Sequence, residues 1–271
     1  MKTGRLQRTL IIFLALSATA ANADVARIAN KPNLNGIWQA MNSANWDLES
    51  HAAKRPDSAW AFGALLTIPA GKSVVVGGKI PYLPQAFKAR EQFRAEWPKS
   101  DPETLCDLPG IPRATYMPYP FQILQGGRDI LMVYSYATAN RTIHMGPHEE
   151  APVDSWMGRS EGHWEGDTLV VETHGFNGRA HLDRAGNYFS ADLKVIERFT
   201  LQNPNVIRYE ATLQDPKTYS APWTIRMPLY KHVEESAEIL EHKCVPFVEE
   251  LMYKDLELPG QRIDASPPPG E

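Results

Sequence analysis

Histidines are concentrated in one part of this 271-residue chain. The chain has 8 histidines, and most of them fall in a single stretch: His144, His148, His163, His174 and His181. An imidazole has an ordinary pKa near 6.5, so it can exchange a proton or bind a metal ion at neutral pH. This stretch is therefore the first candidate for acid–base or metal chemistry.

Residues 156–174 surround two of these histidines with strand-forming residues. Glu165-Gly166 lies between two such runs and predicts a two-residue hairpin loop. The pairs across that hairpin would be Trp164 with Asp167, His163 with Thr168, and Arg159 with Glu172. Because side chains alternate along a strand, one face would carry Trp156, Gly162, Trp164, Leu169 and Val171, and the other Arg159, Glu161, His163, Thr168, Val170, Glu172 and His174.

The polar face of this hairpin has two interpretations. It is a solvated surface if it points outward, or a site of proton transfer if it lines a cavity, because a carboxylate orients and tunes a neighbouring imidazole. In the catalytic interpretation, His163 or His174 is the acid or base, Glu161 and Glu172 orient it or transfer a second proton, and Arg141 or Arg159 stabilises an anion.

A metal site is the alternative use of the same histidines. His144 and His148 are four residues apart and are followed by Glu149-Glu150, but Gly146-Pro147 favours a turn over the helix that this spacing would need. Since no recognised ligand spacing is present, we expect no metal and no other cofactor. The alternative zinc-type site would draw on His144, His148, His163 and His174.

Two cysteines, Cys106 and Cys244, are the only ones in the chain. In an oxidising compartment they predict one disulfide, while a thiolate metal site is the alternative. Residues 1–23 predict such a compartment, since they combine Lys2, Arg5 and Arg8 with a short apolar run and the small residues Ala-Asn-Ala at 21–23. This pattern is typical of a signal peptide, so we expect a periplasmic or secreted protein.

Composition excludes several classes of protein. With 43% hydrophobic residues the chain can form a core, so it is not a wholly disordered protein. A net charge of −4 argues against a nucleic-acid partner. No later apolar run reaches the length of a membrane helix, so stable membrane insertion is not expected. The sequence also lacks a P-loop, a Gly-x-Ser-x-Gly elbow and a dinucleotide-binding fingerprint.

The elements that must hold these residues are mostly strands. Pro84 and the aromatic spacing that follows predict one short N-terminal helix over 84–97. Gly36-x-Trp38 is typical of the first strand of lipocalin-like barrels. Short β-type runs then follow at 119–125, 129–137, 141–145, 156–164, 168–176, 193–202, 206–213, 223–230 and 237–244.

This order predicts a mainly β protein: an antiparallel lipocalin-like barrel or sandwich of about nine strands. The apolar run 72–80, which has glycines at its ends, is a candidate for a further strand. We expect a single domain over 24–257, followed by a disordered tail at 258–271 that is rich in proline.

Residues 156–171, with the pattern W-x-G-x-S-x-G-x-W-E-G-D-T-L-V-V, resemble a motif of a large family of exported, mostly uncharacterised bacterial proteins. The runs at 106–113, 120–123, 175–177, 197–199 and 215–216 also fit that family. Its pattern usually has Asp in place of Glu172 and a His in place of Phe189. The resemblance implies an exported β-rich fold and supplies no reaction.

Together these features favour an exported β-barrel enzyme that acts on a small hydrophobic or aromatic molecule. It would use cofactor-free acid–base chemistry, as an isomerase, lyase, cyclase or hydrolase. One alternative is a non-catalytic periplasmic protein that binds such a ligand, and a second is a His-ligated metalloenzyme. The oligomeric state is not predicted.

Overall fold

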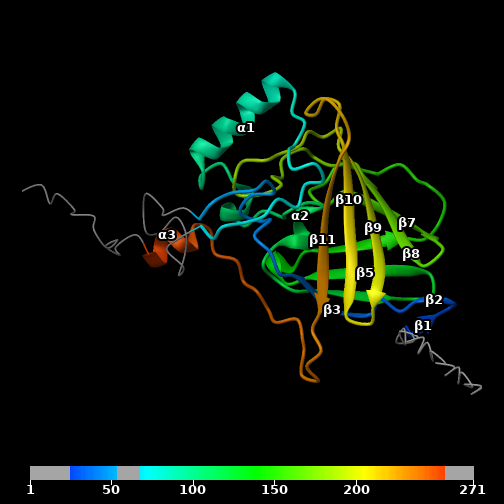
Figure 1. Ribbon diagram of the computed structural model, residues 1–271. Coiled ribbons are helices and arrows are strands. Elements are labelled where there is room, and N and C mark those ends of the chain that lie inside the picture. Colours follow the sequence, from blue (N-terminus) through cyan, green and yellow to red (C-terminus); the bar gives the residue numbers. More distant parts are fainter. Residues whose placement is uncertain (1–24, 54–67, 254–271) are drawn as a thin grey trace, which may run out of the picture.

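A closed barrel of nine strands forms the centre of the computed structural model, which describes residues 25–53 and 68–253 (Figure 1). The strands are β3 (Gly36–Ala40), β4 (Phe121–Gln125), β5 (Asp129–Tyr134), β6 (Asn140–His144), β7 (Arg159–Glu165), β8 (Thr168–His174), β9 (Lys194–Asn203), β10 (Val206–Gln214) and β11 (Trp223–Lys231). The prediction of a mainly β fold is confirmed, and of its two forms the barrel is found. The predicted signal peptide and tail lie outside the described residues.

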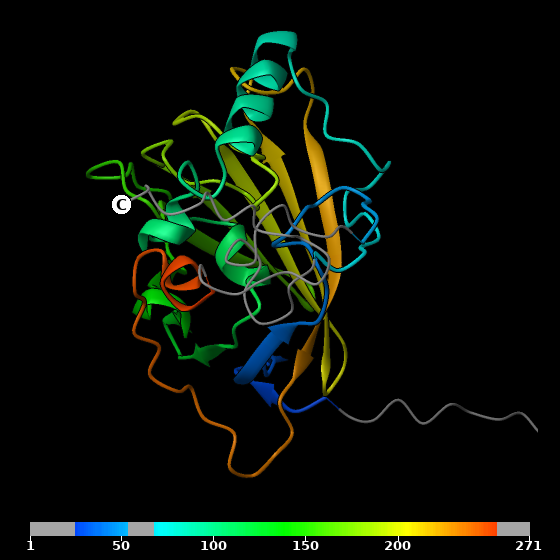
Figure 2. The same ribbon diagram turned by 90° about the vertical axis from the view of Figure 1, so that its left-hand side faces the viewer.

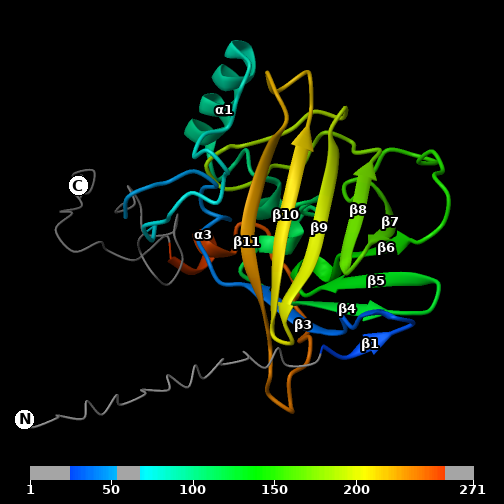
Figure 3. The ribbon, with the colours of Figure 1, turned by 45° about the vertical axis from the view of Figure 1, so that its right-hand side comes forward.

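Neighbouring strands follow the order β10-β11-β3-β4-β5-β6-β7-β8-β9, and β9 closes the ring on β10. Figure 3 shows the long strands β9, β10 and β11 side by side, with the shorter β4, β5 and β6 running at a steep angle to them. All pairs are antiparallel except β6 with β7, so the barrel is mixed. A parallel pair needs a crossover, and here residues 145–158 provide it.

Alternation along the strands fills the barrel with apolar side chains. Phe121, Leu169 and Phe199 are fully buried there. Trp38, from the Gly-x-Trp pattern, is also fully buried; its indole N–H donates to the Leu34 carbonyl at 2.9 Å.

Three local predictions are corrected by the structure. The hairpin loop is Gly166-Asp167, one residue later than expected, so Trp164 pairs with Leu169 and Arg159 with His174. Gly166 is at the first loop position and has φ +59°. A glycine adopts this φ at little cost, whereas a glutamate such as Glu165 would be strained there. The run 237–244 forms no strand, and β3 completes the nine instead. Within 72–80 only an isolated bridge forms, from Val75 to Ile225.

The remaining elements are short helices and a two-stranded hairpin outside the barrel. The predicted helix is found as α1 (Pro84–Glu96), which stands above the strands in Figure 2. Its Phe93 ring packs on Tyr188, in the connection from β8 to β9, with ring centroids 5.1 Å apart. The other elements are β1 (Arg27–Ile28), β2 (Lys31–Pro32), η2 (Pro102–Leu105), α2 (Arg113–Tyr116), η3 (Tyr136–Thr138) and α3 (Val248–Tyr253).

The predicted disulfide is confirmed. Cys106 and Cys244 are bonded, with Cα atoms 5.7 Å apart, and they tie the C-terminal arm to η2. Among the described residues, no helix has the length and apolar character needed to cross a bilayer.

Candidate functional site

The polar face of the β7–β8 hairpin points out of the barrel. Leu169 and Val171 on the opposite face are fully buried in the interior, whereas the side chain of His163 is 63% exposed. The assignment of residues to the two faces does not depend on the shifted loop, because the register moves by an even number of residues. Of the two interpretations, the geometry is that of an outward surface.

Glu161 is the centre of a cluster on this outer surface. Its Oε1 accepts the Glu149 N–H (2.7 Å) and the Arg159 Nε–H (3.1 Å), and its Oε2 lies 2.6 Å from His148 Nδ1. Burial opposes ionisation of Glu161, but these three contacts outweigh it and lower its pKa to about 2. The same carboxylate raises the pKa of His148.

The structure brings four of the predicted residues together here and leaves others apart. His148 and His174 have ring centroids 5.1 Å apart, and Arg159 and Glu161 lie beside them. The remaining outward residues pair elsewhere: His163 with Glu165 at 3.3 Å, and Glu172 with Lys194 at 2.5 Å. His144 lies on β6 outside the cluster of potential ligand atoms.

Arg141, predicted to stabilise an anion, lies inside the barrel. Its Nη1 is 2.7 Å from Glu197 Oε2, and the Tyr209 hydroxyl donates to Glu197 Oε1 at 2.8 Å. Burial favours loss of the proton, yet the charge of Glu197 raises the pKa of Arg141 above its ordinary value. Arg141 is therefore already occupied by an internal carboxylate.

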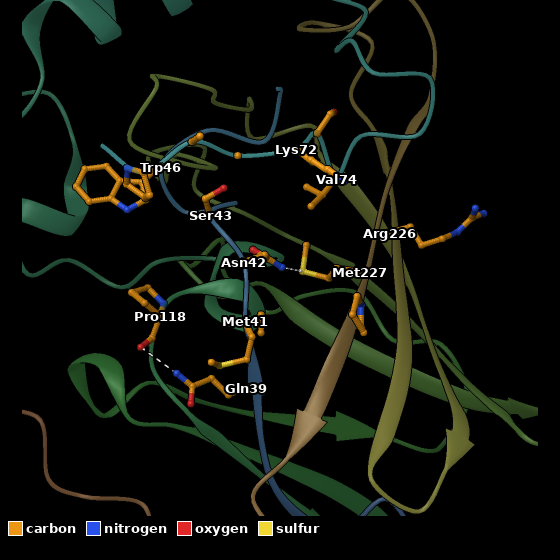
Figure 4. Close-up of a pocket in the computed structure, with 16 residues that line it drawn as sticks. Gln39, Met41, Asn42, Ser43, Trp46, Lys72, Val74, Pro118, Arg226 and Met227 are labelled. Atoms are coloured by element: carbon orange, nitrogen blue, oxygen red, sulfur yellow. Dashed lines mark hydrogen bonds between the residues drawn. The ribbon is translucent and has the colours of Figure 1, made fainter. Parts of the chain in front are cut away.

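A groove of about 630 Å³ opens where β11 changes partners (Figure 4). One end of β11 pairs with β3. Near its other end, the Arg226 N–H donates to Val74 and the Val76 N–H donates to Thr224, both at 2.8 Å. Pro228 lies on the same edge between these two partners. It has no N–H to leave unpaired, so the strand can tolerate the gap.

The groove has apolar walls and a few polar groups. Its walls include Met41, Trp46, Val74, Pro118 and Met227, and the polar groups include Gln39, Asn42, Ser43 and Lys72. Met41 is 69% exposed, and Asn42 is held by a contact of its amide nitrogen with the Met227 sulfur at 3.2 Å. Arg226 points away from the groove (Figure 4) and binds Glu210.

A cation–π contact with Arg184 holds the Trp46 side chain in place. The Arg184 guanidinium lies 4.5 Å from the Trp46 ring centroid, and Arg184 in turn binds Glu103 at 2.8 Å. Glu103 also binds Arg113, whose guanidinium pairs with Asp101. Burial opposes ionisation of Glu103, but the charges of Arg184 and Arg113 outweigh it and lower the pKa of Glu103 to about 2. This buried network fixes the wall of the groove.

Sequence reasoning missed the groove because residues 39–83 have no periodic pattern. A clue was available in the apolar residues Met41 and Trp46, which follow the first strand outside any strand or helix pattern. The inward pair was also missed, although Glu197 is in phase with the apolar residues Val195 and Phe199 on β9. A charge at an inward position of a strand is the signal for a buried partner.

A second groove, of about 470 Å³, lies beside the β1–β2 hairpin. Its lining includes His163, Trp164, Met145 and Lys31. It forms beyond the short parallel pairing of β6 and β7, where Gly162 leaves room for the Met145 sulfur. Of the described residues that line this groove, His163 is the one with an imidazole.

Comparisons with protein-family models, curated proteins and solved structures found no match to this chain.

Proposed function

We propose that this protein is an exported binding protein for a small hydrophobic or aromatic molecule. The observation that carries the proposal is the groove beside Trp46, whose volume of about 630 Å³ lies within the range of small-molecule sites. Its walls are an indole, two thioethers and apolar side chains. Such groups bind apolar ligands through buried area and ring contacts.

The groove favours binding over chemistry, because the described residues that line it include no histidine and no carboxylate. Within the described part of the lining, the charged residues are Lys72 and Arg226, and Arg226 is paired with Glu210 outside the groove. The ligand is therefore neutral or carries one negative group near Lys72. Export agrees with the disulfide and with the signal-peptide pattern at 1–23.

Anilinonaphthalene sulfonate, an aromatic anion, is the probe for this proposal. We expect saturable binding to the folded protein, seen as a rise in probe fluorescence. Met41→Asp should weaken that binding more than about tenfold, because it places a negative carboxylate in an apolar wall beside the negative sulfonate of the probe. Trp46→Ala should also weaken it by removing the ring.

Val153→Asp is the matched control, because Val153 is 71% exposed, like Met41, but lines neither groove. Its affinity for the probe should equal that of the parent protein. Equal affinities for Met41→Asp and Val153→Asp would rule out the Trp46 groove as the binding site.

The second candidate function is acid–base catalysis at the groove beside Trp164. It is favoured by His163, which lines that groove and has Glu165 3.3 Å away to orient its ring. With p-nitrophenyl acetate, His163 would take a proton from water as the water adds to the ester carbonyl, and acetate and p-nitrophenol would be released. His163→Gln should then lower kcat/KM about 100-fold. A parent rate no faster than free imidazole at the same concentration would exclude this function.

A further inference from the structure

We infer that His148, Glu150 and His174 form a binding site for a divalent transition-metal ion, with zinc as the ion that best fits the ligands. One potential ligand atom from each residue lies within 4.8 Å of the other two. The site is on the outer face of β8, distinct from both grooves, so it does not depend on the proposed ligand-binding function. Two imidazoles and one carboxylate are a set that zinc uses, with at least one position left for water.

His174 provides the first reason to expect a ligand here. Its Nε2 is buried and has no hydrogen-bond partner among the residues that the structure describes. A buried nitrogen without a partner costs free energy, and a bound metal ion would remove that cost. The His148 ring lies beside it, with its centroid 5.1 Å from that of His174.

His148 provides the second reason, because it is already oriented as a metal ligand. Glu161 binds its Nδ1 at 2.6 Å, which leaves Nε2 on the side of Glu150, 3.7 Å from that carboxylate. A carboxylate behind a ligating histidine fixes the ring and its tautomer in zinc sites. Glu161 is thus a positioning residue, itself fixed by the Glu149 N–H and Arg159.

The connection from β6 to β7 carries two of the ligands, and backbone contacts hold it against β8. The Ser155 N–H donates to Gly175 at 2.9 Å, and the Asn177 N–H donates to Ser155 at 2.9 Å. Gly175 has φ +69°, and a Cβ there would lie 2.4 Å from that of Ala151. The close approach that brings Glu150 toward His174 therefore requires this glycine. A bound ion would tie the connection to the strand.

Isothermal titration calorimetry, with zinc chloride added to the metal-free full chain, tests the site. We expect one ion per chain, and a loss of affinity greater than about tenfold for His148→Gln and for His174→Gln. His163→Gln is the matched control, since it removes an exposed imidazole from the same hairpin face, and it should leave the zinc affinity within about twofold.

Glu150→Gln and Glu161→Gln extend the test. Glu150→Gln removes a ligand whose side chain is 91% exposed, so it should keep the fold and still weaken zinc binding. Glu161→Gln should weaken it by about ten- to a hundredfold without touching the ion. Equal affinity in the parent, His174→Gln and Glu150→Gln would overturn the site, as would a loss in His163→Gln as large as that in His174→Gln.

Discussion

Two ion-pair clusters lie on opposite faces of the same part of the barrel wall. Inside, Arg141 and Glu197 are shielded from water, with side chains 2% and 0% exposed. Outside, Glu161 binds His148, whose side chain is 58% exposed. The neighbours Ser160 and Glu161 on β7 belong one to each cluster, since Ser160 is 3.4 Å from Arg141.

The chemical groups of the two clusters are similar, but their access to water differs, and this difference gives the clusters different roles. A buried ion pair cannot exchange its partner, and loss of one member leaves a charge without solvent. An ion pair at the surface contributes little to stability but can reorganise around a ligand. We therefore expect the inner cluster to govern folding and the outer cluster to govern binding.

The largest expected effect is on the inner pair. Glu197→Gln should lower the free energy of unfolding by about 3–5 kcal/mol, because Arg141 remains buried and charged without a counter-ion. Urea denaturation measures the change. The triple variant Arg141→Met, Glu197→Leu, Tyr209→Phe removes both charges and the hydroxyl bound to them, so it should recover most of the loss. A small effect of Glu197→Gln alone would mean that water reaches the interior.

A smaller loss is expected for the outer cluster. Glu161→Gln should lower the free energy of unfolding by about 1–3 kcal/mol, because it weakens charge-assisted hydrogen bonds from the Glu149 N–H and Arg159. Glu149→Gln is the control: its side chain is 67% exposed and its bond to Arg159 is at the surface. Urea denaturation should give a loss for Glu161→Gln between those of Glu149→Gln and Glu197→Gln, and any other order would contradict the comparison.

The outer cluster should also make stability depend on pH in two directions. The pKa of Glu161 is lowered from 4.5 to about 2, so its contribution is present above pH 4.5 and is lost as the pH falls toward 2. The pKa of His148 is raised from 6.5, so its contribution is present below that pH and is lost as the pH rises through the raised value. The difference in unfolding free energy between the parent and Glu161→Gln should therefore be bell-shaped in pH. A flat difference would argue against the coupling of these two groups.

The inner and outer faces of the β7–β8 hairpin also show how much of the structure could be predicted from the sequence. Alternation predicted the barrel strands and separated Trp164 and Leu169 from His163 and Glu172. It could not say which face is inside, because both faces of β8 carry valines, and Val170 on the polar face is buried as well. The loop was misplaced because Glu165-Gly166 and Gly166-Asp167 both suit a tight turn, and only the pairing of Glu165 with Thr168 distinguishes them.

The candidate sites were harder to predict for a different reason. The metal cluster joins His148 and Glu150 from a long connection to His174 on a strand, and no local spacing encodes that approach. The groove depends on β11 changing partners from β3 to residues 74–76. Both partners are far from β11 in the sequence, so no local pattern predicts this change. The disulfide was predictable, because two cysteines allow one pairing.

The smallest effect is expected for the outward residues that lie outside the cluster. Glu172 binds Lys194 with both side chains well exposed, at 37% and 41%, so water replaces that bond easily. Glu172→Gln should change the free energy of unfolding by less than about 0.5 kcal/mol. His163→Gln should likewise leave the urea midpoint unchanged, since its contact with Glu165 is also at the surface. Urea denaturation of both variants beside Glu161→Gln tests this, and a loss as large as that of Glu161→Gln would show that the whole polar face, and not the cluster alone, stabilises the barrel.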